Sequence, residues 1–176
     1  MAVLPHGSWP SPITAHSLVA GAVGLGEVIV DGADIWWAET RPDEGGRTVV
    51  VRRTSDGSVV DAVPGGVDVR SGVHEYGGGA WWVADGVLVH VDRSDERLVR
   101  REPGRPDVEP MVLTPPSDLA RGLRYADGRI TPDGQWSICV RESHVDRGAD
   151  TKTSTRHEPS MATATSSLAG SAPPST

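Results

Sequence analysis

Several residue types that bear on function are scarce or missing from this 176-residue chain. Cys139 is the only cysteine, which excludes an internal disulfide and a cysteine-based zinc site. Phenylalanine and asparagine are absent, and Lys152 is the only lysine, so arginine provides nearly all the positive charge. We interpret this bias as a property of a GC-rich coding sequence rather than of a chemical function.

The chain also lacks a long hydrophobic run and an excess of positive charge. No segment approaches the roughly 20 apolar residues that a membrane-spanning helix needs. The N-terminus has no basic stretch of the kind that begins a signal peptide. The net charge of −7 argues against nucleic acid and anionic membrane surfaces as partners. We therefore predict a cytoplasmic protein that binds no nucleic acid and no membrane.

Motifs for catalysis and for cofactor binding are missing as well. The nucleophile motif of α/β-hydrolases, Gly-x-Ser-x-Gly, does not occur. Residues 21–26 are glycine-rich like a nucleotide loop, but no Gly-Lys-Ser/Thr follows them. The histidines outside residue 74 are not spaced as metal ligands, and residues 92–96 lack the spacing and glycine of a calcium loop. We predict no catalytic residue, no cofactor and no metal site.

The chain is instead rich in short apolar stretches bounded by turn residues. It holds 21 glycines and 14 prolines, and Asp-Gly or Gly-Gly pairs separate stretches of valine, isoleucine and tryptophan, as in β-hairpins. We expect strands over residues 28–30, 34–39, 48–53, 59–60, 80–83, 87–91, 97–100, 108–113, 129–130 and 136–140.

The hairpins recur at a regular interval, which predicts the fold class. Gly32, Gly86 and Gly134 lie about 50 residues apart, close to the period of β-propeller blades. We predict an all-β partial propeller of about two and a half four-stranded antiparallel blades, with an unrelated all-β sandwich as the alternative. We divide the chain into an N-terminal extended segment over 1–26, the partial propeller over 27–146 and a disordered tail over 147–176.

The predicted tail differs in composition from the rest of the chain. It is dominated by serine, threonine, alanine and proline and has no aromatic residue. Such a segment cannot bury enough apolar surface to offset the entropy lost on ordering. Because the change falls inside a blade, we hypothesise that a frameshift produced it.

One run combines polar residues with three glycines and is the candidate site. Histidine and glutamate can exchange protons near neutral pH, so an acid–base role is one interpretation. Neighbours on a regular strand face opposite sides, so only the histidine and the tyrosine could share a face. The alternative is a cluster that closes a blade, with glycines that let the backbone pass closely. We predict a structural or substrate-channel cluster of His74, Glu75, Tyr76, Gly77, Gly78 and Gly79.

Two tryptophan pairs are the other conspicuous feature. Residues 36–37 and 81–82 could form a platform for a carbohydrate or a peptide. Because both faces of a propeller blade are covered by neighbouring blades, we predict that these rings belong to the core between blades. We also expect Cys139 to be buried and unreactive.

Three motifs carry a resemblance to a known enzyme family. Over roughly residues 5–145, the chain resembles the N-terminal part of bacterial prolyl oligopeptidase-family serine peptidases, of the dipeptidyl aminopeptidase/acylaminoacyl peptidase type. The motifs are Gly7-Ser8-Trp9-Pro10-Ser11-Pro12-Ile13-Thr14, Val73-His74-Glu75-Tyr76-Gly77-Gly78-Gly79, and Arg124-Tyr125-Ala126-Asp127-Gly128 followed by Thr131-Pro132-Asp133-Gly134.

The resemblance implies a function for the whole enzyme and a part of it for this chain. In that family an N-terminal propeller restricts access to a Ser-Asp-His triad in an α/β-hydrolase domain, so that only short peptides enter. No position here matches the triad. We therefore predict a truncated gating propeller that is inactive alone, with short peptides and the missing hydrolase domain as partners. A partial ring leaves blade faces bare, so we expect a marginally stable, aggregation-prone chain.

Two other functions remain open from the sequence. The first is a small propeller-like scaffold that binds proteins or peptides and closes by forming an oligomer. The second is an independent hydrolase that uses His74 and Glu75, which the missing nucleophile disfavours.

Overall fold

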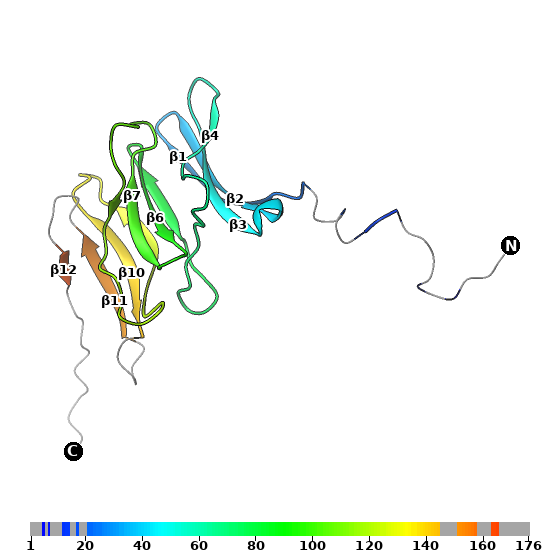
Figure 1. Ribbon diagram of the computed structural model, residues 1–176. Helices are drawn as coiled ribbons and strands as arrows, with labels where there is room; N and C mark the ends of the chain where they lie inside the picture. The colour runs from blue at the N-terminus through cyan, green and yellow to red at the C-terminus, as the bar shows by residue number, and fades with distance from the viewer. Residues whose placement is uncertain are drawn as a thin grey trace, which may run out of the picture.

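Three antiparallel β-sheets form the described part of the chain (Figure 1). The structure is a computed structural model that describes residues 21–144, 151–157 and 163–165, with Pro5, Gly7, residues 12–14 and Ser17. Within these residues, each sheet has four strands, and strands that follow each other in the chain pair with each other. A four-stranded meander of this kind is the blade of a β-propeller.

The strands follow one another in chain order through the three blades. A short 3-10 helix, η1 (Pro42–Glu44), lies between the second and third strands. Blade 1 consists of β1 (Gly24–Asp31), β2 (Asp34–Arg41), β3 (Arg47–Arg53) and β4 (Val59–Asp61). Blade 2 consists of β5 (Trp81–Ala84), β6 (Val87–Asp92), β7 (Arg97–Arg101) and β8 (Met111–Val112), and blade 3 of β9 (Leu123–Ile130), β10 (Ser137–Ser143), β11 (Thr151–His157) and β12 (Thr163–Thr165).

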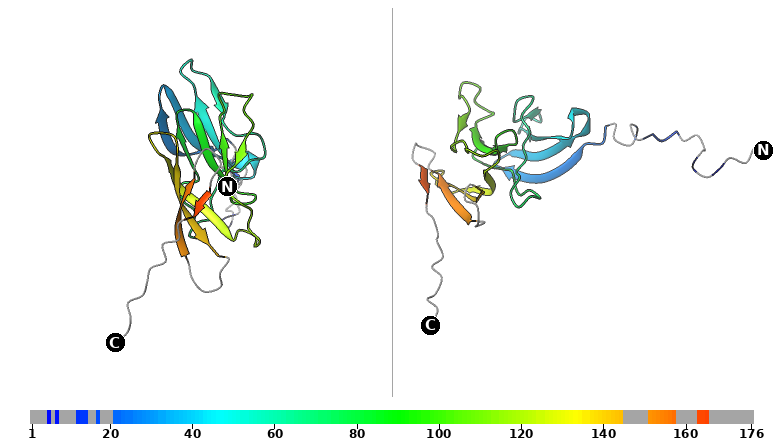
Figure 2. Two further views of the ribbon diagram at one scale, coloured as in Figure 1. Left: turned by 90° about the vertical axis from the view of Figure 1, so that its left-hand side faces the viewer. Right: turned by 60° about the horizontal axis from the view of Figure 1, so that its bottom comes forward.

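The first strands of the three blades lie together at the centre of the arrangement. Strand β5 contacts both β1 and β9, although it belongs to a different sheet from either. The blades spread from this line, with β4 and β12 on opposite sides of the described sheets (Figures 1 and 2). The predicted all-β partial propeller is therefore confirmed.

The core lies between the blades and contains most of the paired tryptophans. Trp36 from blade 1 and Trp81 and Trp82 from blade 2 are almost fully buried, and Trp37 is partly buried against them. Cys139 is buried in the same cluster. Trp36, Trp81 and Trp82 lie between blades as predicted, because successive strand residues face opposite sides of a sheet and both sides of blade 2 are covered. Trp37 differs, because it lies beside Val28 on the outward face of blade 1, which no described blade covers.

The predicted turns agree with the structure, and each predicted strand overlaps an observed one, but three bounds differ. Gly32, Gly86 and Gly134 all have positive φ, at 60°, 75° and 69°, as tight hairpin turns require. Strand β1 begins at Gly24, inside the predicted N-terminal segment, and β8 covers only Met111–Val112 of the predicted strand over 108–113. The third difference is at the start of blade 3. Strand β9, however, begins at Leu123 and not at residue 129. Its Asp127 and the glycine after it form a β-bulge rather than a turn, which allows the strand to continue.

Blade 3 gains its two outer strands from the segment that was predicted to be a disordered tail. The backbone of β11 pairs with β10 from Ser143↔Thr151 to Ser137↔His157, and β12 pairs with β11. Residues 145–150, 158–162 and 166–176 lie outside the described residues, so for them the disordered tail and the frameshift stay predictions. The difference has a physical reason, because the exposed N–H and C=O groups of an edge strand can pair with a backbone of almost any composition.

The outward face of blade 1 is apolar and uncovered by other described residues. Leu25, Val28 and Val30 are 75%, 69% and 69% exposed and lie on one face of β1, opposite Glu39, Trp37 and Ile35 of β2. A bare blade face is what the sequence predicts for a partial ring. Whether it causes aggregation stays a prediction.

Blades 2 and 3 meet at a contact that only glycine allows. A Cβ on Gly128 would lie 2.1 Å from two ring atoms of Trp82. The ring is held in place because its Nε1 donates a hydrogen bond to the Ser137 hydroxyl at 3.1 Å. Strand β9 therefore packs its backbone directly against the indole.

We predict that Gly128→Ala destabilises the fold by about 1–3 kcal/mol, the usual cost of overpacking a tight core. The matched control is Gly65→Ala, where an added Cβ meets no atom within 4 Å; we expect it to change stability by at most about 0.5 kcal/mol. Urea unfolding of both variants measures the difference. Equal urea midpoints for the two variants would show that an added Cβ at position 128 does not disturb the packing of the Trp82 ring.

Candidate functional site

The candidate run, residues 74–79, lies in the loop that leads from blade 1 into β5. Residues 73–76 form turns, and β5 begins only at Trp81. His74 and Glu75 both have left-handed backbone conformations, with φ of 56° and 66°, which L-residues adopt at a cost. The strand alternation considered for these side chains therefore does not apply, and Tyr76 points into solvent with 98% of its surface exposed.

The polar half of the run is tied to blade 3 by charged side chains. The His74 amide donates to Oε2 of the buried Glu142 at 3.1 Å, and its Nδ1 lies 3.6 Å from Oε1 of the same carboxylate. Arg124 on β9 donates to Glu75 at 2.9 Å and to the Gly72 carbonyl at 2.8 Å. These contacts account for the strained turn, because both of its left-handed residues are held from outside.

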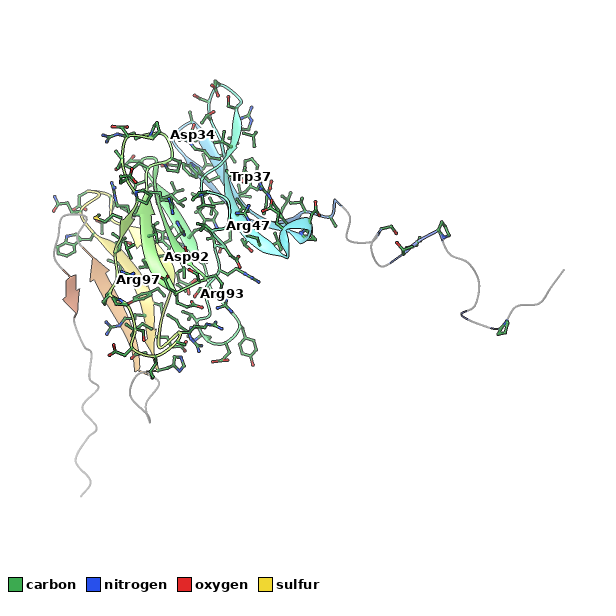
Figure 3. All side chains as sticks on the ribbon, in the orientation of Figure 1. Asp34, Trp37, Arg47, Asp92, Arg93 and Arg97 are labelled. Carbon is green, nitrogen blue, oxygen red and sulfur yellow. The ribbon has the colours of Figure 1, made fainter. Side chains whose placement is uncertain are left out.

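A second buried carboxylate holds the start of the same loop. Glu96 is fully buried and accepts a hydrogen bond from the Gly72 amide at 3.0 Å. It is neutralised by Arg121, whose Nε lies 3.0 Å away, and by Arg93 in the β6–β7 turn, which is labelled in Figure 3. A buried carboxylate with two guanidinium partners and an amide donor is satisfied, so this group has a structural role.

The glycines of the run bring two other carboxylates together. The Gly79 amide donates to Asp127 Oδ1 at 2.8 Å, and the Asp127 amide donates back to the Gly79 carbonyl at 2.8 Å. A Cβ on Gly79 would lie 3.0 Å from Asp127 Oδ1 and 3.4 Å from Glu27 Oε1. A Cβ on Gly78 would lie 2.8 Å from the Ala126 side chain. Any larger residue at position 79 would thus stand between the two carboxylates.

Both carboxylates sit on β-bulges of first strands, in blades 1 and 3. Glu27 lies at the register shift of β1 and has a φ of 30°, and Asp127 lies at the register shift of β9 and has a φ of 55°. Bulges redirect a side chain out of the regular alternation. We call these two residues the Glu27–Asp127 pair.

Glu27 of the pair lines a cleft between blade 1 and the segment that leads into β5. The cleft has a volume of about 280 Å³, and Arg70, Tyr76, Gly78 and Trp81 also line it. Partial burial raises the pKa of Glu27, and the nearby Asp127 carboxylate raises it further, against the opposing effects of Arg129 and the Trp81 indole. The Asp127 carboxylate thus lies close enough to Glu27 to disfavour its charged form.

The remaining polar groups offer no alternative reaction centre. His90 on β6 is buried, its Nε2 accepts a hydrogen bond from Arg101 at 3.0 Å, and burial lowers its pKa to about 4. It is therefore neutral near pH 7. Among the described residues, no three His, Cys, Asp or Glu side chains are grouped as metal ligands, and no helix is long and apolar enough to cross a membrane.

Residues 74–79 are the part of this site that the sequence predicts. Arg124 and Asp127 belong to a motif of the resemblance but were not assigned to the site, and Glu27 and Glu142 were not singled out. A local signal existed for the pair, because each acid adjoins a glycine, Gly26 or Gly128, inside a strand, which is typical of a β-bulge. No local signal marks Glu142 or Arg124, since their role depends on a loop some 50 to 70 residues earlier in the chain.

Comparison with known proteins finds similar solved structures and nothing else. No family model and no curated protein matches the chain. A puromycin-hydrolyzing peptidase of Mycobacterium tuberculosis is 37% identical over 91% of this chain, with a TM-score of 0.75. A puromycin hydrolase is 32% identical over 90%, with a TM-score of 0.77, and a mutant of a puromycin hydrolase complexed with PGG is 35% identical over 88%, with a TM-score of 0.76. The chain spans 25% of the length of each.

We predict that Glu142→Gln destabilises the protein near neutral pH by about 1–3 kcal/mol, because it removes the charge that holds the His74 amide, Arg124 and His144. Burial opposes ionisation of Glu142, but the hydrogen bonds and these positive neighbours prevail and lower its pKa below the ordinary 4.5. The ionised form therefore stabilises the fold above pH 4.5, and this contribution is lost as the pH falls through the lowered pKa.

Urea unfolding at about pH 7 and about pH 4 tests this linkage. The gap between wild type and Glu142→Gln should be large at the higher pH and should shrink at the lower one. Glu109→Gln, which alters an exposed carboxylate, is the control. A gap that is equal at both pH values would contradict the role of the charge.

Proposed function

The chain resembles the β-propeller part of prolyl oligopeptidase-family serine peptidases, and from this premise we propose that it is the substrate-gating part of such an enzyme. The observation that carries the proposal is 32–37% identity to puromycin-hydrolysing peptidases over about nine tenths of this chain. Identity at that level, together with TM-scores of 0.75 to 0.77, supports a shared role as well as a shared fold.

We propose that the catalytic residues of the enzyme lie outside this chain. The sequence has no nucleophile motif, and its two buried acidic clusters hold a loop in place. The chain spans a quarter of each similar enzyme, which leaves most of their length for a hydrolase domain. The chain alone is then inactive, and it limits entry to short peptides through the cleft beside the first strands.

More specific assignments extend the same proposal. The motifs that carry the resemblance favour the dipeptidyl aminopeptidase/acylaminoacyl peptidase type, with short peptides as substrates and the cytoplasm as the compartment. Puromycin, which the similar enzymes hydrolyse, is a candidate substrate of the assembled enzyme.

A second function, a scaffold that closes by forming an oligomer, draws support from the bare face of β1. Leu25, Val28 and Val30 would be covered if another copy supplied a blade. Native mass spectrometry separates the two functions, because a stable oligomer of defined size favours the scaffold and a monomer favours the gating part.

The gating proposal predicts the activity of a chimera. The matching quarter of the M. tuberculosis puromycin-hydrolyzing peptidase is replaced by this chain, with the parent enzyme as control. We expect the chimera to hydrolyse puromycin and tripeptides but not casein, and the 176-residue chain alone to hydrolyse none of them. A folded chimera that cleaves casein, or one that is inactive on every substrate, would contradict the proposal.

A further inference from the structure

Tyr76 combines an exposed ring with a fixed backbone. Its surface is 98% exposed, more than that of any other large hydrophobic residue that the structure describes. The contacts from Glu142 and Arg124 hold the two residues before it, and the Gly77 amide donates to the Val73 carbonyl at 2.9 Å. An aromatic ring on a fixed backbone loses little conformational entropy when a partner covers it. Tyr76 is therefore suited to contact a partner from outside the described residues.

The ring stands at the mouth of the cleft, above an apolar floor. Tyr76 and Glu27 both line this cleft. Its buried apolar side chains, none of them more than 8% exposed, belong to Ala38, Val69, Ala80 and Trp81. Because these residues are buried and Tyr76 is exposed, a group that enters past the ring meets apolar surface. Such a surface favours an apolar group over a polar one.

Three polar side chains that line the cleft already have partners within the chain. Arg70 is paired with both carboxylate oxygens of Asp68. The Ser71 hydroxyl donates to the Tyr125 carbonyl at 2.6 Å. Glu27 has the indole of the cleft floor as its hydrogen-bond partner. A sugar or another polar ligand would find few free side-chain partners among the described residues of this cleft, whereas an apolar group needs none.

We propose that this cleft binds one bulky apolar side chain, aromatic or branched, of a short peptide, and that the Tyr76 ring packs against that side chain. The cleft volume of about 280 Å³ lies just below the roughly 300–1,000 Å³ of small-molecule sites, so it fits one side chain and not a helix. Two aromatic rings in edge-to-face or offset contact also attract each other beyond the area that they bury. The inference rests on the proposed function, whose substrates are short peptides, and it makes Tyr76 a specificity-determining residue for them.

Titration of the 176-residue chain with capped amino acids, followed by NMR, tests the site. N-acetylphenylalaninamide and N-acetylalaninamide carry no charge, so a difference between them reports on the side chain alone. We expect the phenylalanine derivative to bind with a Kd of about 1 mM and the alanine derivative not to bind at about 10 mM. The chain has two tyrosines and Tyr125 is buried, so a shift of the Tyr76 ring signal identifies the place of binding.

Two variants of Tyr76 and one on the bare face of β1 locate the contact. Tyr76→Ala should weaken binding of the phenylalanine derivative about tenfold. Tyr76→Phe keeps the ring and should bind as the wild type does. Leu25→Ala alters the most exposed side chain of the β1 face and should leave binding unchanged. Both altered side chains are exposed, so the fold is preserved, which circular dichroism verifies.

Three results of this titration would overturn the proposal. Equal binding of the two derivatives would show that the cleft does not select an apolar side chain. Unchanged binding by Tyr76→Ala would remove the role of the ring. Binding that is lost in Leu25→Ala and kept in Tyr76→Ala would place the ligand on the face of β1 instead.

The chimera with the M. tuberculosis peptidase separates this inference from the proposed function. There, Tyr76→Ala should raise KM for Phe-Phe-Phe about tenfold and leave KM for Ala-Ala-Ala and both kcat values unchanged. An equal loss of activity on both peptides would overturn the proposal and show that Tyr76 contacts the hydrolase domain. A chimera that cleaves casein would reject gating and keep the site, whereas a gating chimera without binding of the phenylalanine derivative would reject only the site.

Discussion

The close packing of β5 against β9 is the contact on which the rest of the structure depends. It joins blade 2 to blade 3 through a tryptophan ring that lies directly on the backbone of Gly128. The same approach brings Gly79 within hydrogen-bonding distance of Asp127. Glycine is required at both points because a single Cβ would occupy the space of the neighbouring atoms. The core and the position of the Asp127 carboxylate thus depend on the same pair of strands.

Buried charge has a different task in this fold, which is to fix a loop that has little apolar content. The segment that enters β5 has consecutive left-handed residues and three glycines, so it would be mobile if left to its own propensities. Glu96 and Glu142 hold it through backbone amides and are themselves neutralised by arginine and histidine side chains. Burying these two carboxylates costs desolvation free energy, but their hydrogen bonds hold the loop in one conformation. A loop that lines a cleft must keep one conformation for the cleft to keep its shape.

The bare face of blade 1 and the open cleft both follow from incomplete ring closure among the described strands. In a closed propeller every blade face is covered, and the first strands surround a central channel. Here β1 presents valine and leucine side chains to solvent, and the bulged carboxylates of β1 and β9 flank β5 without a fourth neighbour. The same geometry leaves the apolar face of β1 and the Glu27 side chain in the cleft exposed to solvent.

The sequence by itself determined the blades, because strands and hairpins are local. Short apolar stretches and Asp-Gly turns specify each meander, and the 50-residue recurrence of those turns specifies how blades follow each other. Only the tertiary structure decided the site. Asp127-Gly128 could be a turn or a bulge until β10 paired with it, and Glu27 meets Asp127 only because β1 and β9 flank the same strand. Contacts between residues 100 positions apart are set by packing, which no local pattern encodes.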